Sequence, residues 1–102
     1  MTKNFTINCL NIKTKDDLYS ELGAAFHFSN YYGKNLDALL DCLRDLGDTF
    51  QDSNQVSINI TFLNFSSCIK SLTEDFNGGI FSVFNFWKNE YSNIGIKINF
   101  EL

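Results

Sequence analysis

Three segments of apolar–polar alternation, far apart in the chain, constrain the fold more than any other feature of the sequence. They cover residues 5–9, 56–62 and 94–100, and every second side chain in each of them is apolar. A period of two is typical of a β-strand that buries only one of its faces. A chain of 102 residues can bury one hydrophobic core around such strands, so we expect a single domain over residues 1–102.

Helical periodicity fills the intervals between these strands. Thr14 begins the first helix with a capping-box pattern, and apolar residues then recur at intervals of three and four. Gly47 is a plausible C-terminal stop for the second helix. We expect helices over residues 15–26, from Asn35 to Gly47, over residues 64–72, and from within residues 73–79 to about Tyr91, with a polar loop over residues 48–55.

The resulting order of elements is β-α-α-β-α-α-β. Strands that alternate with helices pair in parallel through right-handed crossovers. Parallel strands that are covered on both faces usually form continuous apolar runs, whereas these three alternate, so we expect the helices mainly on one face. The predicted fold class is therefore α/β, with a small three-stranded parallel sheet packed with about four helices.

The helix predicted to begin at Asn35 sorts its side chains onto two faces. The face that must meet the core carries Leu36, Leu39, Leu40, Leu43 and Leu46. A second face carries Asp37, Asp41, Asp45 and Asp48 within about 80° of one another, with only Arg44 beside them. Neighbouring like charges cost about 0.2–0.5 kcal/mol each. The helix dipole accounts for Asp37 in the first turn but not for Asp45 near the expected C-terminal end, so this acidic face is a candidate surface for a partner.

The overall charge points to a basic partner. The formal net charge is −4, whereas a protein that binds nucleic acid directly needs a surplus of lysine and arginine. We therefore expect no direct contact with nucleic acid.

Nothing in the first residues begins a signal peptide, and no apolar run approaches the length of a membrane span. We expect a cytoplasmic protein that does not bind a membrane.

The cysteines and the single histidine do not form a recognisable site. Cys9, Cys42 and Cys68 lack the spacing of metal ligands and leave one thiol over in any disulfide scheme, so we expect reduced thiols and no metal. His27 has no partner at a catalytic spacing and is expected at a helix end or in a loop. We expect no cofactor.

One stretch has a longer and more specific pattern. It runs Tyr31-Tyr32-Gly33-x-Asn35-Leu36-Asp37-Ala38-Leu39-x-Asp41-Cys42-Leu43. This pattern resembles the barstar family of ribonuclease inhibitors, and weaker similarity extends over the whole chain. The resemblance implies a three-stranded parallel sheet with helices. It also implies an intracellular protein that blocks a basic ribonuclease, such as a secreted or delivered toxin, in a 1:1 complex. For a small acidic protein we expect a monomer when free.

The resemblance also implies roles for individual residues, because in this family the second helix and the preceding loop enter the basic cleft of the enzyme. Asp41 would occupy a phosphate position, and Asp37 would bind nearby basic groups. Tyr31 would stack beside the catalytic histidine, while Gly33 and Asn35 would shape the loop. The complete set of predicted partner-binding residues is Tyr31, Tyr32, Gly33, Asn35, Leu36, Asp37, Leu40, Asp41, Asp45 and Leu46.

Two alternatives use the same acidic face. An immunity protein that mimics nucleic acid could block a nuclease toxin of another fold. A carboxylate-dependent enzyme could use Asp37 and Asp41 for acid–base work or for holding Mg²⁺. The enzyme is disfavoured because both carboxylates come from one helix and no glycine-rich phosphate loop accompanies them. We therefore expect no catalytic residues.

Overall fold

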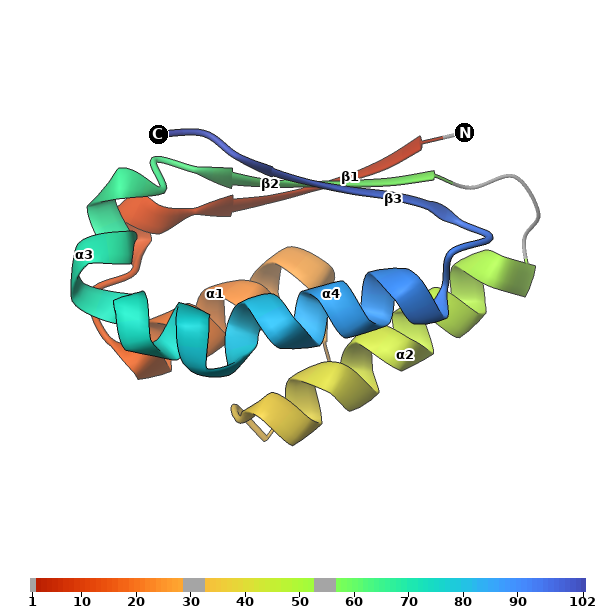
Figure 1. The fold of residues 1–102 in the computed structure, drawn as a ribbon, viewed down its shortest axis with the longest axis horizontal. Helices are drawn as coiled ribbons and strands as arrows, with labels where there is room; N and C mark the ends of the chain where they lie inside the picture. Colours follow the sequence, from red (N-terminus) through yellow and green to blue (C-terminus); the bar gives the residue numbers. More distant parts are fainter. Residues whose placement is uncertain (1, 29–32, 53–56) are drawn as a thin grey trace.

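A three-stranded sheet forms one layer of the molecule. The computed structural model describes residues 2–28, 33–52 and 57–102. Strands β1 (Thr2–Asn8), β2 (Ser57–Leu63) and β3 (Gly95–Phe100) lie in the order β1-β2-β3, and both neighbouring pairs are parallel (Figure 1). The predicted α/β class and parallel sheet are confirmed. β1 begins three residues before the predicted strand, because pairing with β2 extends to Thr2 although Thr2, Lys3 and Asn4 carry no apolar alternation.

The helices form a second layer on one face of this sheet (Figure 1). They comprise the 3₁₀ turn η1 (Cys9–Asn11), α1 (Lys15–Phe26), α2 (Leu36–Asp52), α3 (Ser66–Asp75), the π-helical turn η2 (Phe76–Ile80) and α4 (Phe81–Glu90). The last three follow one another without a break and bend at Leu72, where φ is −120° and ψ is 22°. Because α3, η2 and α4 form one continuous helical segment, the described residues contain three helical segments besides η1, one fewer than predicted.

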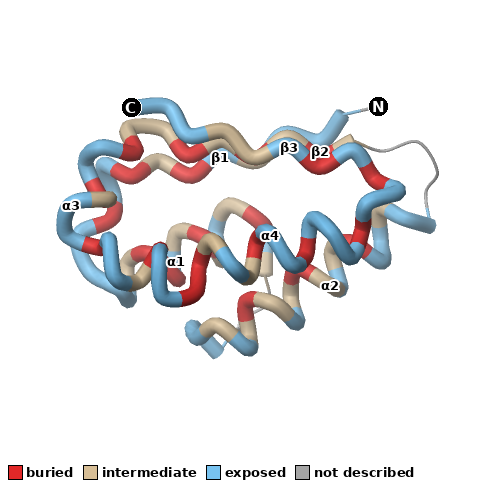
Figure 2. Tube along the Cα trace, in the orientation of Figure 1, coloured by how far each residue is buried: buried red, intermediate tan, exposed pale blue. Residues whose placement is uncertain are grey.

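The alternation of the strands places their apolar side chains between the two layers. Ile58, Ile60 and Phe62 of β2 are almost completely buried. Figure 2 shows buried positions recurring along the strands and along the helices below them. On the other face of the sheet, Asn59 Nδ2 donates to Asn4 Oδ1 at 3.3 Å, and Asn99 Nδ2 donates to Asn59 Oδ1 at 3.0 Å. The asparagines in the strands thus satisfy one another on the face that carries no helix.

An aromatic stripe at helical spacing near the C-terminus belongs to the core. Phe76, Ile80, Phe84, Trp87 and Tyr91 are all buried. Phe81 lies off this stripe, and its ring packs against those of Phe76 and Phe100, with centroids 5.2 and 5.5 Å apart. The irregular π-helical turn before α4 changes the rotation of the helix, so a residue off the ideal stripe still packs on the aromatic cluster.

Gly47 does not end α2, and this prediction is wrong. The helix continues to Asp52, so residues 48–52 of the predicted loop are helical, while residues 53–55 lie outside the described part of the chain. Gly47 is buried against Tyr91, and a Cβ at position 47 would lie 2.8 Å from Cε1 and Cζ of the tyrosine ring. The glycine serves close packing inside the helix, and this tertiary contact outweighs its low helix propensity.

We predict that Gly47→Ala destabilises the protein by about 1–2 kcal/mol, because the added methyl group collides with a rigid ring. The expected sign is notable, since Gly→Ala in a helix normally stabilises by about 0.5–1 kcal/mol. Urea denaturation measures the free energy of unfolding. Gly78→Ala is the matched control, because a Cβ there meets nothing within 4 Å. Equal changes for the two variants would contradict the packing argument.

Candidate partner-binding surface

The loop before α2 leads directly into the predicted site. Asn35 Oδ1 accepts a hydrogen bond from Ala38 N at 2.8 Å, and Asn35 Nδ2 donates to Gly33 O at 3.2 Å. Asn35 is therefore the N-cap of α2, as predicted, and it also ties the helix to the exposed Gly33. Tyr31 and Tyr32 lie outside the described residues.

The longer helix extends the predicted acidic face. Because α2 reaches Asp52, one more carboxylate follows Asp48 at a spacing of four, on the same side of the helix. We call this set the acidic row, and it consists of Asp37, Asp41, Asp45, Asp48 and Asp52, all of them exposed. The carboxylates of Asp37, Asp41 and Asp45 form no hydrogen bond or ion pair with any of the described residues, although the backbone oxygen of Asp45 accepts from Thr49 Oγ1. Asp45 was expected near the C-terminal end of the helix, but it lies in the middle of α2 because the helix continues to Asp52.

The opposite side of α2 anchors the row to the core. Leu39 and Leu43 are completely buried, while Leu36, Leu40 and Leu46 are partly buried against the core. Leu36 packs so closely on η2 that a Cβ at Gly79 would collide with it. Leu36, Leu40 and Leu46 therefore lie at the boundary between core and surface, and their predicted role in partner binding stays a prediction.

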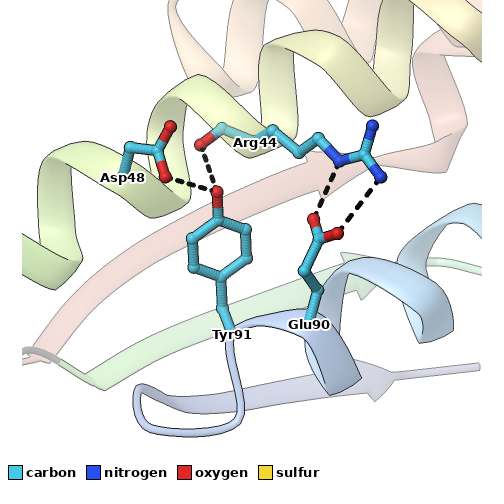
Figure 3. A network of polar contacts seen from close by, with 4 residues as sticks. All are labelled: Arg44, Asp48, Glu90 and Tyr91. Carbon is cyan, nitrogen blue, oxygen red and sulfur yellow. Dashed lines mark hydrogen bonds and ion pairs between the residues drawn. The ribbon is translucent and has the colours of Figure 1, made fainter.

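A polar contact between α2 and the end of α4 fixes the other flank of the row (Figure 3). Arg44 donates from Nε to Glu90 Oε1 at 2.8 Å and from Nη2 to Glu90 Oε2 at 3.1 Å. The Tyr91 hydroxyl donates to Asp48 Oδ1 at 2.6 Å and lies 3.0 Å from the carbonyl oxygen of Arg44. We call these four residues, Arg44, Asp48, Glu90 and Tyr91, the α2–α4 brace. Asp48 thus has a structural partner, unlike Asp37, Asp41 and Asp45.

Sequence reasoning did not find the brace. Arg44 is the single cation beside four carboxylates, which indicates an ion pair but not its partner. Glu90 follows 46 positions later and Tyr91 lies 43 positions after Asp48, so only the fold brings these side chains together.

The electrostatics of the brace leave the row negative. The two hydrogen bonds that Arg44 donates to Glu90 raise the pKa of Arg44, and its positive charge is paired with a carboxylate outside the row. Burial, together with the hydrogen bond to Asp48, raises the pKa of Tyr91 to about 12. Burial and then the charges of Asp45 and Asp41 raise the pKa of the Cys42 thiol. At least three carboxylates of the row thus lack an ion-pair partner among the described residues.

The remaining candidate residues are separate from this surface or peripheral to it. Cys9 and Cys68 are buried free thiols, and His27 is the exposed C-cap of α1 with a left-handed φ of 58°. His27 therefore lies at a helix end, as predicted. In the ranges 2–28, 33–52 and 57–102, no three metal-ligating side chains converge. Nor does that part of the chain contain a helix long and apolar enough to cross a membrane.

Comparison with known families agrees with this architecture. The family model described as Barstar (barnase inhibitor) matches residues 2–102. The chain belongs to the barstar family. A search of curated proteins finds no match. The match covers both layers of the fold, and the family's description names inhibition of a ribonuclease, barnase, as its activity.

Within this barstar-family fold, the predicted site residues fall into one region as far as they are described. Gly33, Asn35 and Asp37 lie at the start of α2, and Asp41 and Asp45 follow at successive turns of the same helix. The N-terminal half of α2 is the part of the helical layer that projects farthest from the sheet (Figure 1). A partner can therefore approach the acidic row without meeting the sheet.

We predict a pH-dependent contribution of Tyr91 to stability. Its pKa of about 12 in the folded protein exceeds the ordinary value of 10.0, so the unfolded chain loses the phenolic proton first as the pH rises. Below pH 10, the free energy of unfolding of the wild type should exceed that of Tyr91→Phe by about 1 kcal/mol. This difference should decline between pH 10 and 12. Urea denaturation at a series of pH values measures this difference.

The difference between the wild type and Tyr91→Phe isolates the contribution of Tyr91 to the pH dependence of stability. The pKa of the buried Cys9 thiol is also raised to about 12, but Cys9 is present in both proteins and its contribution cancels. A difference that stays constant from pH 8 to pH 12 would contradict the assignment of the raised pKa to the brace.

Proposed function

We propose that the protein inhibits a basic ribonuclease by placing α2 and the loop before it in the active-site cleft. The observation that carries this proposal is the acidic row. Asp37, Asp41 and Asp45 stand exposed and without a counterion among the described residues, on a helix of a barstar-family chain. A ribonuclease cleft is built to bind successive phosphates, and carboxylates spaced along a helix offer a similar series of anions.

The chemistry of recognition follows from the residue types. A carboxylate can accept two parallel hydrogen bonds from an arginine, and such bonds are stronger than neutral ones. They gain further strength when the partner excludes water from the contact. Asp41 would take the central position, with Asp37 binding adjacent basic groups. Asp45 would extend the contact toward the C-terminal half of α2.

The rest of α2 supports this role by holding the carboxylates in place before binding. Leu39 and Leu43 are completely buried, and the Asn35 cap fixes the first turn. A surface that is already ordered loses less conformational entropy on association, so more of the interaction energy contributes to affinity. Tyr31, Tyr32, Gly33 and Asn35 would contact the partner beside the first turn. Leu36, Leu40 and Leu46 would complete the apolar edge in a 1:1 cytoplasmic complex.

We predict that Asp41→Asn weakens inhibition of RNA cleavage by barnase about 30-fold or more, mainly through faster dissociation. The substitution keeps the shape of the side chain but leaves cationic groups of the enzyme buried without an anion. Loss of one partner from such a pair costs about 2–5 kcal/mol, a range partly set by barnase and barstar themselves. Inhibition constants and dissociation rates, measured with purified proteins, test this expectation.

Glu101→Gln is the matched control, because it removes the same charge from an exposed side chain after β3. Figure 1 places this end of the chain at the sheet, away from α2. Equal effects of Asp41→Asn and Glu101→Gln would overturn the site. Failure of the wild type to inhibit barnase at equimolar ratio would exclude this enzyme and favour a nuclease of another fold.

We also predict that salt slows association with barnase. The acidic row creates a long-range attraction for a basic cleft, and this attraction is screened within about 10 Å at 0.1 M salt. The association rate should fall about tenfold or more between about 0.01 and 1 M salt, while the dissociation rate changes much less. Stopped-flow mixing measures both rates. An association rate independent of salt would show that the row does not steer the encounter.

A further inference from the structure

We propose that the ribonuclease-binding surface continues from the acidic row across Arg44 to Phe86 on α4, and that Phe86 is an apolar anchor for the rim of the enzyme's basic cleft. This inference rests on the proposed function and adds a second helix to its surface. Arg44, Phe86 and Glu90 are named the aromatic flank. The partner it fits is a basic protein whose cationic cleft is bordered by apolar side chains or by the aliphatic stems of lysine and arginine.

The aromatic flank is an ordered feature of the surface. Phe86 is 51% exposed, and the guanidinium carbon of Arg44 lies 5.4 Å from the centroid of its ring. The bidentate bonds to Glu90 hold the guanidinium in this position. A cation over an aromatic face contributes about 0.5–1 kcal/mol at an exposed site. Phe86 is therefore presented in a defined orientation, which lowers the entropy lost on binding.

The flank also lies within reach of a partner bound at Asp41. Asp41 and Arg44 are neighbours on one side of α2, and the charge of Asp41 contributes to raising the pKa of Arg44. Arg44 follows Asp41 by one helical turn and its guanidinium carbon lies 5.4 Å from the centroid of the Phe86 ring, so Phe86 lies on the order of 15 Å from Asp41. A protein interface of standard size covers about 800 Å² on each partner, which corresponds to a disc with a radius of about 16 Å. An enzyme that covers Asp41 symmetrically would cover Phe86 as well.

The charge pattern favours an apolar contact at this position. Glu90 compensates Arg44, so the flank adds little net repulsion toward a basic enzyme. The carboxylates of the row attract the cationic groups of the cleft, and the aliphatic stems of those groups then need an apolar surface nearby. Aromatic and arginine side chains are enriched in the energetically important part of protein interfaces. The flank brings the two types together beside an anionic surface.

Leu10 provides a matched comparison, since it is an exposed apolar residue of similar accessibility, at 58%. It belongs to η1, which lies beside α3 at the far end of the molecule from the middle of α2 (Figure 1). Phe86→Ala and Leu10→Ala therefore remove comparable exposed apolar area at two places that differ in their distance from the acidic row.

The experiment measures binding of barnase to the wild type and to Phe86→Ala, Phe86→Leu, Leu10→Ala and Asp41→Asn, with thermal unfolding of each free protein. Phe86→Ala should raise the dissociation rate about tenfold or more and leave the association rate and its salt dependence unchanged, because no charge is altered. Phe86→Leu should have a smaller effect in the same direction. Leu10→Ala should bind like the wild type.

The outcomes separate this inference from the function on which it rests. Dissociation rates equal to the wild type for both Phe86 variants, together with strong weakening by Asp41→Asn, would overturn the aromatic flank and leave the inhibitor function in place. An unaffected Asp41→Asn would overturn the function itself. If Phe86→Ala fails to fold, the dissociation rate of Phe86→Leu, which keeps an apolar side chain, decides whether Phe86 contributes to binding.

Discussion

The close approach of α2 to Tyr91 is the contact on which the geometry of the surface depends. Gly47 lacks a side chain, so the tyrosine ring can lie against the helix backbone. In this position the hydroxyl reaches Asp48 and the carbonyl oxygen of Arg44. The neighbouring Glu90 then meets the Arg44 guanidinium with two hydrogen bonds. One glycine in the middle of a helix thus sets the position of the brace and of the flank that it supports.

The sequence predicted the two layers of the fold correctly, but it did not predict where α2 ends. The order of strands and helices predicted the parallel sheet. Period-two alternation, a local property, predicted helices on one face because each strand has only one apolar side. The helix end predicted at Gly47 is wrong because glycine in the same pattern can end a helix or allow a close neighbour. The neighbour, Tyr91, lies 44 positions away. The extension of α2, and with it the place of Asp52 in the acidic row, could not be predicted from local signals.

The candidate site shows the same division. The leucine and aspartate faces of α2 follow from helical spacing alone, and Leu39 and Leu43 are buried as that spacing requires. The hydrogen bond from Tyr91 to Asp48 depends on tertiary structure, and it gives the Asp48 carboxylate a partner that Asp41 and Asp45 lack among the described residues. Phe86 could not be predicted as part of the site, because single exposed apolar residues are normal on protein surfaces. The role proposed for Phe86 rests on its contact with Arg44, which the fold creates.

The arrangement separates the parts of α2 that stabilise the fold from those left for a partner. The buried leucines stabilise one side of the helix, the Asn35 cap stabilises its first turn, and the brace links it to the end of α4. The helix dipole offsets part of the cost of Asp37 in the first turn, and the Tyr91 hydroxyl offsets that of Asp48. Asp41 and Asp45 receive no comparable compensation among the described residues. Their mutual repulsion costs only about 0.2–0.5 kcal/mol, which a domain can tolerate. A basic partner would relieve this repulsion and gain the attraction of both carboxylates, so the least compensated part of the row is where binding has the most to contribute.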